Sequence, residues 1–328
     1  MIRSQLRRRP LLALVATVTL AAAASGCALT VSPPGPAPLR YRDPVFSTVN
    51  VTSNIAYGTA VDQEGNTDTL QLDMYAPKGD TETSRPAIVW VHGGSFCCLD
   101  KTSPELVDEA TTFAKEGYVN VSINYRLYPQ GCSAGGVTAG CIEAIVQATN
   151  DAQTAVRWLR ANATKYGIDP SRIAIGGSSA GAITAMNVAF ASTQFDKTGS
   201  NQGYSSAVGA AMSLSGARLY GTVDANDAPT LDFHGTADPL VPYAWAVSTQ
   251  KAALAAGLQS YLVTWQGDGH VPYAQHRDEI LLFESNFLYW ELDLADIGTP
   301  LTAAGRARAI AGIENPLGTS TPSKHPSA

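Results

Sequence analysis

The sequence predicts an α/β fold, in which a mainly parallel central sheet is flanked by helices on both faces. Short apolar runs suited to buried strands alternate with longer stretches whose apolar residues recur every three or four positions, as in amphipathic helices. Such alternation builds βαβ units and hence parallel strands. Several of the apolar runs end in glycine-containing segments, and active sites of parallel sheets lie beyond the carboxyl ends of the strands.

The first expected strand covers residues 69–77, which alternate apolar and polar side chains as a half-buried edge strand does. Residues 87–94 (AIVWVHGG) form a short apolar run fit for a buried strand. Residues 103–117 begin with Ser-Pro and end with Gly, which are helix start and stop signals. The further expected strands are 118–127, 172–179, SAVGAAMSLSGA, APTLDFHGTAD and SYLVTWQGDGH, and the further expected helices are 141–167, 180–192, about 242–256 and about 272–290.

Residues 1–27 have the pattern of an export signal. Four arginines and no acid precede an apolar run that ends in Ser-Gly-Cys, and this run is shorter than the roughly 20 apolar residues that span a membrane. Cys27 follows Ala-Ser-Gly and resembles the lipidated cysteine of a bacterial lipobox, although Ala24 stands where leucine is usual. We therefore expect an exported protein, either a cell-surface lipoprotein tethered through Cys27 or a secreted chain cut nearby.

Composition divides the rest of the chain into three parts. Residues 28–49 contain many prolines and predict a Pro-rich tether, while residues 50–297 carry the strand and helix patterns of one large domain. Residues 298–328 lack aromatic side chains and predict a poorly ordered tail. The 328 residues carry a net charge of −6, and this becomes −10 when the four arginines of the signal are removed. This acidity argues against nucleic acid and against polybasic docking on anionic lipid.

Four cysteines follow the predicted signal, and an even number in an exported chain favours disulfides. A bridge between the adjacent Cys97 and Cys98 is geometrically awkward, because disulfides prefer Cα atoms that lie further apart. We therefore expect Cys97 and Cys98 each to pair with Cys132 or Cys141, with both pairings open. Four buried thiols are the alternative.

The segment GGSSAG at 176–181 fits the pattern G-x-S-x-G when Ser179 is its central serine. In this pattern the nucleophile sits on a sharp turn between a strand and a helix, and small flanking residues let the backbones pass closely. The RIAI run before the segment and the helical pattern after it supply that context. An ordinary Gly/Ser turn is the alternative, and in the pattern Ser178 is the variable residue before the nucleophile.

A serine nucleophile needs a base, and an acid must orient that base. Of the five histidines, His270 lies in a loop after a late strand (GDGHVP), with His276 as its main rival. Asp238 follows the strand LDFHG in another loop, and its alternative role is to cap a helix. The HGGSF segment ends an earlier strand, so its backbone N–H groups, with that of Ala180, are placed to bind an oxyanion.

These motifs together resemble those of α/β-hydrolases of the carboxylesterase/lipase type, particularly bacterial feruloyl-esterase-like and hormone-sensitive-lipase-like esterases. The resemblance rests on HGGSF, NYRLYP, DAQTAVRWLRANATKYGIDPSRIAIGGSSAGA, DFHGTADPLVP and GDGH, in this order over roughly residues 50–292. It implies the α/β-hydrolase fold and oxyanion donors at Gly94 and Ser95, beside Ala180. Ser95 departs from the glycine that is usual there. Only residues 218–227 stand where many relatives insert a cap domain, so we expect no large cap.

The resemblance implies a serine esterase with a Ser179–His270–Asp238 triad and an acyl-enzyme intermediate, acting on a small-molecule or polymer-borne ester. It implies neither a metal nor an organic cofactor. A peptidase, a polyester or cell-wall deacylase, and a non-catalytic surface binding protein are the alternatives. Four residues are predicted to contact substrate, and an alternative role in the core is open for the aromatic ones: Phe96, Tyr128, Ser178 and Tyr243.

Overall fold

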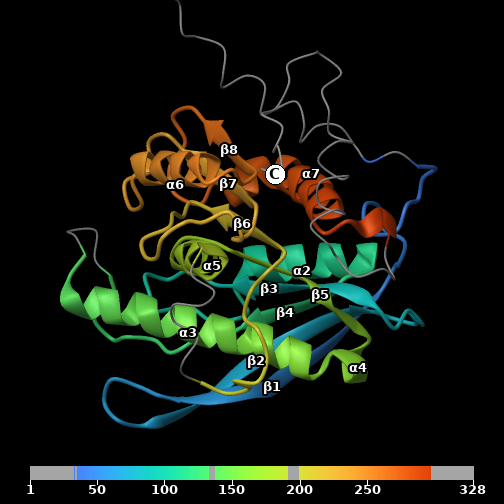
Figure 1. The fold of residues 1–328 in the computed structure, drawn as a ribbon, viewed down its shortest axis with the longest axis horizontal. Coiled ribbons are helices and arrows are strands. Elements are labelled where there is room, and N and C mark those ends of the chain that lie inside the picture. Colours follow the sequence, from blue (N-terminus) through green and yellow to red (C-terminus); the bar gives the residue numbers. More distant parts are fainter. Residues whose placement is uncertain (1–32, 34, 133–136, 191–198, 297–328) are drawn as a thin grey trace, which may run out of the picture.

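The computed structural model describes residues 33, 35–132, 137–190 and 199–296. The predicted signal with Cys27 and the predicted tail lie outside these residues. Within them the strands form a sheet in the order β1-β2-β4-β3-β5-β6-β7-β8 (Figure 1). The strands are β1 (Val49–Val61), β2 (Thr67–Pro77), β3 (Arg85–Val91), β4 (Val119–Ile123), β5 (Ile168–Gly177), β6 (Ala210–Leu214), β7 (Thr230–Gly235) and β8 (Ser260–Trp265).

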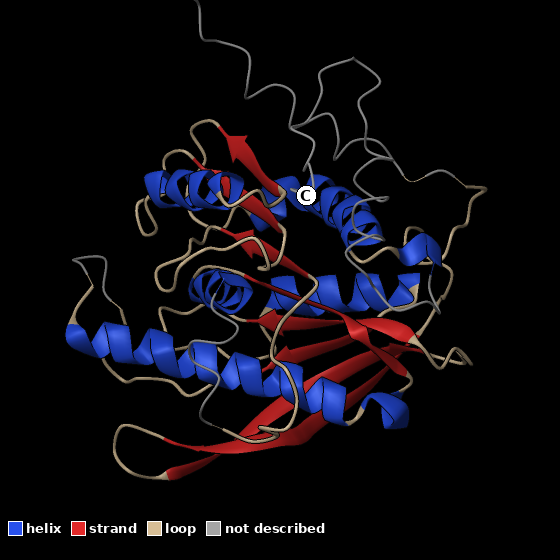
Figure 2. Ribbon diagram, in the orientation of Figure 1, coloured by secondary structure: helices blue, strands red, loops and turns tan. Residues whose placement is uncertain are grey.

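The sheet is parallel from β4 to β8, and only the pairings of β1 with β2 and of β2 with β4 are antiparallel. Helices pack on both faces (Figure 2): α3, α5 and α6 cover one face, and α2 and α7 cover the other. The predicted α/β-hydrolase architecture is confirmed. The helices are α2 (Pro104–Glu116), α3 (Ala139–Ala161), α4 (Ala163–Tyr166), α5 (Ala180–Phe190), α6 (Tyr243–Ala255), α7 (Tyr273–Glu291) and the short η1 (Leu294–Asp296).

Local sequence signals explain where these elements begin and end. Every residue of β3 after Arg85 is buried, as a central strand covered on both faces requires. Helix α2 begins at Pro104, whose missing N–H costs nothing in the first turn, and ends at Gly117, whose φ of 115° is left-handed. Between β6 and β7 the chain runs through residues 215–229 without a helix, so this described connection inserts no cap domain. In the part of the chain that is described, no helix is long and apolar enough to cross a membrane.

The predicted Pro-rich tether at 28–49 is partly packed onto the domain, which corrects the expectation. Tyr41 is only 2% exposed and belongs to the core beside α2. Its N–H donates to the carbonyl oxygen of Glu116 (2.9 Å), and its own carbonyl accepts from the Tyr118 hydroxyl (3.1 Å). Arg40 also donates twice to the Asp80 carboxylate (3.0 and 2.5 Å). The domain therefore begins before residue 49.

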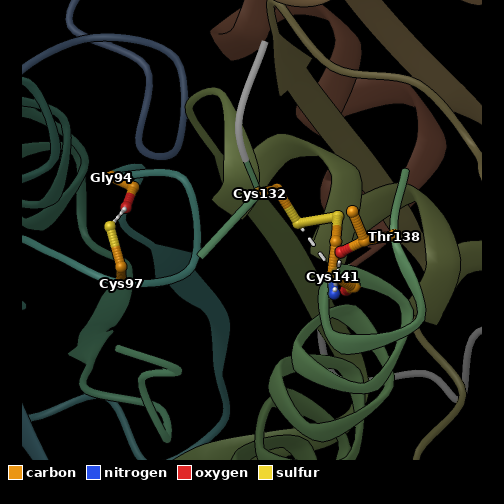
Figure 3. The surroundings of a disulfide bond; sticks show 5 residues. All are labelled: Gly94, Cys97, Cys132, Thr138 and Cys141. Atoms are coloured by element: carbon orange, nitrogen blue, oxygen red, sulfur yellow. Dashed lines mark hydrogen bonds between the residues drawn. A yellow bond between two sulfur atoms is a disulfide. The ribbon is translucent and has the colours of Figure 1, made fainter. Parts of the chain in front are cut away.

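The expected cysteine pairing is wrong. Cys132 and Cys141 bond to each other (Figure 3), with their Cα atoms 4.8 Å apart. Cys97 and Cys98 are free. The bridge ties the loop before α3 to the first turn of that helix, because Cys141 donates its N–H to the N-cap residue Thr138 (3.2 Å). The bonded cysteines are nine positions apart in the sequence, so the bridge closes a local loop rather than reaching the turn after β3.

Buried carboxyl groups lie where α2 packs against α7. Burial raises the pKa of both Glu109 and Glu284 well above the ordinary range, and burial raises that of Glu116 to about 8 although Ser285 donates a hydrogen bond to it (3.3 Å). A group whose pKa is raised by folding stabilises the fold below its unfolded pKa. That contribution is lost as the pH rises through the folded value.

Glu116→Gln is expected to stabilise the protein at pH 9 by roughly 1–3 kcal/mol, because glutamine is never charged, and to change stability little at pH 5. Urea unfolding at the two pH values measures this difference. The matched control is Glu64→Gln, because Glu64 is exposed, and it should shift the free energy of unfolding little at either pH. An equal effect of Glu116→Gln at both pH values would contradict this, because it would show that Glu116 in the folded protein is ionised at pH 5 as well as at pH 9.

Candidate active site

Ser179 lies on the turn between β5 and α5 in a strained conformation. Its φ is 54°, in the left-handed region that serine rarely adopts, and its N–H donates to the carbonyl oxygen of Leu214 (2.9 Å). The flanking positions must be glycine because a larger side chain would collide with β3. An added Cβ would lie 2.5 Å from the carbonyl oxygen of Val91 at Gly177, and 1.9 Å from the same oxygen at Gly181. The G-x-S-x-G pattern is thus explained by how closely the turn passes β3.

Two hydrogen bonds link Ser179, His270 and Asp238 in a line. The Ser179 hydroxyl lies 2.7 Å from Nε2 of His270, and Nδ1 of His270 lies 2.8 Å from Oδ2 of Asp238. The carboxylate only accepts, so Nδ1–H donates to it and Nε2 accepts from the serine hydroxyl. The three predicted residues therefore come together in the geometry that activates a serine nucleophile.

The loops that carry Asp238 and His270 are bonded to each other beyond the ends of β7 and β8. The N–H of Ala237 donates to the carbonyl oxygen of Asp268 (2.9 Å), and a Cβ at Gly235 would lie only 2.3 Å from that oxygen. A third loop contributes Ser215, whose buried hydroxyl accepts from the N–H of Val271 (2.9 Å) next to His270. Sequence reasoning missed Ser215, because only the fold brings the loop after β6 to this histidine.

Asp238 is held ionised by its surroundings. Its Oδ1 accepts the backbone N–H groups of Leu240 (2.8 Å) and Val241 (3.0 Å). Its Oδ2 faces both His270 and His234, whose Nε2 lies 3.3 Å away and also donates to the Val241 carbonyl (2.9 Å). Burial works to raise the pKa of Asp238, but these hydrogen bonds outweigh it and hold the pKa well below its ordinary value. The acid is therefore charged at any pH at which the protein would work.

The segment 92–96, named here the oxyanion loop, touches the serine turn. A Cβ at Gly93 would lie 3.2 Å from that of Ser179. Gly94 (φ 98°) and Ser95 (φ 53°) have left-handed backbones, which turn the loop sharply after β3. Among the described residues, no group accepts the backbone N–H of Gly94, Ser95 or Ala180. These three N–H groups are therefore unengaged, and their role as oxyanion donors stays a prediction.

Of the four predicted substrate contacts, Ser178 and Phe96 lie in the interior. Ser178 is 2% exposed and donates to Oε1 of Glu105 on α2 (2.8 Å), so its hydroxyl is already engaged. Phe96 is 1% exposed and packs edge-on against Tyr125. Neither side chain is placed to contact a substrate, which corrects the expectation for both.

Tyr128 and Tyr243 are both half-buried and lie on different elements. Tyr128 follows β4 and shares a backbone hydrogen bond with the oxyanion loop, since its N–H donates to the Phe96 carbonyl (2.8 Å). Tyr243 begins α6, and its hydroxyl lies 3.1 Å from that of Thr264 on β8. The two tyrosines stay predictions as substrate contacts.

The rival base His276 is engaged elsewhere. Its Nε2 bonds to Asp268 (2.5 Å), and its ring stacks on Trp265 with centroids 3.9 Å apart. His276 lies at the start of α7, at the non-helical position that kinks this helix. Its bonding to a different carboxylate separates it from the Ser179–His270–Asp238 line.

Two family models match the chain. One described as BD-FAE matches residues 72–217, and one described as TAP-like protein matches residues 198–279. Among curated relatives, the phenmedipham hydrolase of Pseudarthrobacter oxydans is 36% identical over 40% of this chain, and the para-nitrobenzyl esterase of Bacillus subtilis (strain 168) is 32% identical over 36%. The chain spans only 25% and 23% of the length of these two relatives.

Among solved structures, the butyrate-bound esterase Est2 of Thermogutta terrifontis superposes with a TM-score of 0.59 at 22% identity. The match covers 73% of this chain and 95% of that one. The protein thus has the α/β-hydrolase fold. The family models and the curated relatives that match are of the carboxylesterase/lipase type, and the chain is similar to them over these parts of its length.

Proposed function

We propose that this protein is a serine hydrolase of carboxylic esters that acts through an acyl-enzyme. The observation that supports this most strongly is the unbroken line of hydrogen bonds from Ser179 through His270 to Asp238, at 2.7 and 2.8 Å. The unengaged N–H groups of the oxyanion loop beside Ser179 complete the set that ester hydrolysis needs.

In the proposed reaction the Ser179 oxygen attacks the ester carbonyl while Nε2 of His270 takes its proton. Asp238 stays ionised and stabilises the imidazolium that forms. The N–H groups of Gly94, Ser95 and Ala180 bind the oxygen as it becomes negative. The tetrahedral intermediate collapses, the alcohol leaves with the proton from His270, and the acyl group stays on Ser179. A water molecule deprotonated by His270 then hydrolyses the acyl-enzyme.

We propose short-to-medium acyl esters or aryl esters as the substrates. The relative named para-nitrobenzyl esterase and the esterase structure described as butyrate-bound support this class. The connection from β6 to β7 carries no cap, which leaves access for a bulky or polymer-borne ester. A polyester or cell-wall deacylase would use the same chemistry, as would a peptidase. We further propose that the protein is exported, free or tethered to a membrane through lipidated Cys27.

The test combines active-site labelling with a substrate series. The purified protein is treated with a fluorophosphonate probe and the labelled peptide is mapped, and hydrolysis of p-nitrophenyl esters from acetate to palmitate is then followed. We expect the label on Ser179 and the highest kcat/KM with acetate or butyrate. Labelling with turnover of peptides but not of esters would favour a peptidase. Folded protein that neither labels nor turns over any ester would favour a binding protein.

A further inference from the structure

Cys97 and Cys98 are adjacent free thiols in the turn that directly follows the oxyanion loop. Cys98 is exposed and Cys97 is half-buried. The two residues are consecutive in the chain, so their side chains branch from neighbouring Cα atoms. The N–H groups of both residues donate to the carbonyl oxygen of Gly94 (3.0 and 3.1 Å), and the Cys97 sulfur lies 3.3 Å from the same oxygen (Figure 3).

We propose that Cys97 and Cys98 form a redox-modifiable site, which a low-molecular-weight disulfide oxidises to a bridge between the two adjacent residues. The effect of this oxidation on catalysis rests on the proposed esterase function, whereas the redox site itself does not. The disulfide between Cys132 and Cys141 is a separate structural bridge and is already formed.

The reaction balances as thiol–disulfide exchange. The Cys98 thiolate attacks one sulfur of the oxidant, which releases one thiol and leaves a mixed disulfide on Cys98. The Cys97 thiolate then attacks the Cys98 sulfur and releases the second thiol. Two protons and two electrons pass from the protein to the oxidant. Cys98 reacts first because it is exposed, whereas the adjacent Cys98 thiol and partial burial raise the pKa of the Cys97 thiol.

Oxidation would alter the oxyanion loop through the carbonyl of Gly94. This carbonyl and the N–H of Ser95 belong to one planar peptide unit and point in opposite directions, so the donors on the carbonyl also orient the N–H. A disulfide has no S–H, so the contact from Cys97 is lost. Adjacent Cα atoms are about 3.8 Å apart, below the usual range for a disulfide, so the ring also strains the peptide whose N–H Cys98 donates. Strained bridges of this kind are readily reduced again.

Cys132 is the competing partner for Cys97. A Cβ at the neighbouring Gly131 would lie only 3.0 Å from the Cys97 sulfur, and the N–H of Cys132 donates to the carbonyl oxygen of Ser95 (2.8 Å). Exchange of the existing bridge with Cys97 is therefore the rearrangement that the experiment must distinguish from a bridge between Cys97 and Cys98.

Trypsin makes this distinction possible, because it places the two cysteine pairs in different peptides. Cys97 and Cys98 fall in residues 79–101, since the Arg85–Pro86 bond resists cleavage, and the other pair falls in residues 127–157. The purified protein is incubated with increasing oxidised glutathione, its free thiols are blocked with N-ethylmaleimide, and the unreduced digest is analysed by mass spectrometry.

We expect peptide 79–101 to pass from two maleimide additions to none, with a mass two hydrogens below that of the dithiol and no glutathione attached. Peptide 127–157 should carry no maleimide throughout. Two additions at every oxidant concentration, glutathione retained on the wild-type peptide, or a cross-link between the two peptides would each overturn the proposal. Cys97→Ser is the control, since its hydroxyl can still face Gly94 but cannot resolve the mixed disulfide; glutathione should therefore stay on Cys98.

The effect of oxidation on the reactivity of Ser179 is measured on the same samples, as the rate of fluorophosphonate labelling. Oxidation should slow labelling by at least about threefold, because an oxyanion donor is misdirected, and brief reduction should restore it. The Cys98→Ser variant should react with the fluorophosphonate at the same rate in the presence and in the absence of oxidised glutathione. An unchanged labelling rate in an oxidised wild-type sample would overturn the proposed effect of the bridge on the oxyanion loop. Protein that labels in neither state would refute the esterase function, while the peptide masses would still decide the redox site.

Discussion

Replacement of Ser179 by alanine is expected to lower kcat for p-nitrophenyl butyrate by about 10⁴- to 10⁶-fold, with little change in stability. The variant loses the only atom that can form the acyl-enzyme, while the oxyanion donors and the buried turn stay in place. The measurement is kcat from steady-state hydrolysis, and the thermal unfolding midpoint shows whether the variant is folded. Fluorophosphonate labelling should disappear in the same variant.

Ser178→Ala is the matched control, because it removes the same hydroxyl from the adjacent residue. Ser178 donates to Glu105 and is buried, so its loss should weaken the packing of the turn against α2 and reduce kcat far less than Ser179→Ala does. If Ser178→Ala were the inactive variant, the assignment of the nucleophile within GGSSAG would be wrong.

Asp238→Asn is expected to lower kcat by about 10⁴-fold at neutral pH. Two backbone N–H groups, from Leu240 and Val241, hold Oδ1 of the native side chain. The asparagine oxygen should take that place, which puts its NH₂ group where Oδ2 faces His270. The amide then donates to Nδ1 and forces the proton of the neutral imidazole onto Nε2. In that tautomer His270 cannot accept the proton of Ser179.

Asp268→Asn is the control for the second acid in this region. Asp268 lies two residues before His270 but bonds to His276 instead. This variant should keep kcat within about tenfold of the native value, because substitutions outside a catalytic hydrogen-bond line usually act through modest structural effects. A comparable loss in both variants would mean that the two carboxylates act as one network.

The central part of the fold could be predicted because each element carries its own local signal. The buried run of β3 and the Pro and Gly that bound α2 are visible in the sequence. Strand β1 was missed because most of its residues are exposed and it lacks the alternation of a half-buried strand. The packing of Tyr41 was missed because its partners lie more than seventy residues away, on the turn after α2.

The candidate site shows the same division. Ser179, Asp238 and His270 were found because each stands in a motif that follows a strand, and parallel strands bring such ends together. The burial of Ser178 and Phe96 could not be predicted, because a motif does not specify the direction in which each side chain points. The cysteine pairing failed because separation along the chain does not report which sulfur atoms meet. Ser215 carries no signal beyond a position after β6.

The distance along the chain between the proposed nucleophile and its proposed base makes this pair a probe of folding. Ser179 and His270 are 91 residues apart, and they meet only when β5, β6, β7 and β8 have paired. A chain with this part of the sheet open keeps the serine but leaves it without its base. The fraction of molecules that react with a fluorophosphonate in a urea series should therefore follow the global unfolding curve. Labelling of Ser179 in the purified protein would then report which fraction of the molecules is folded.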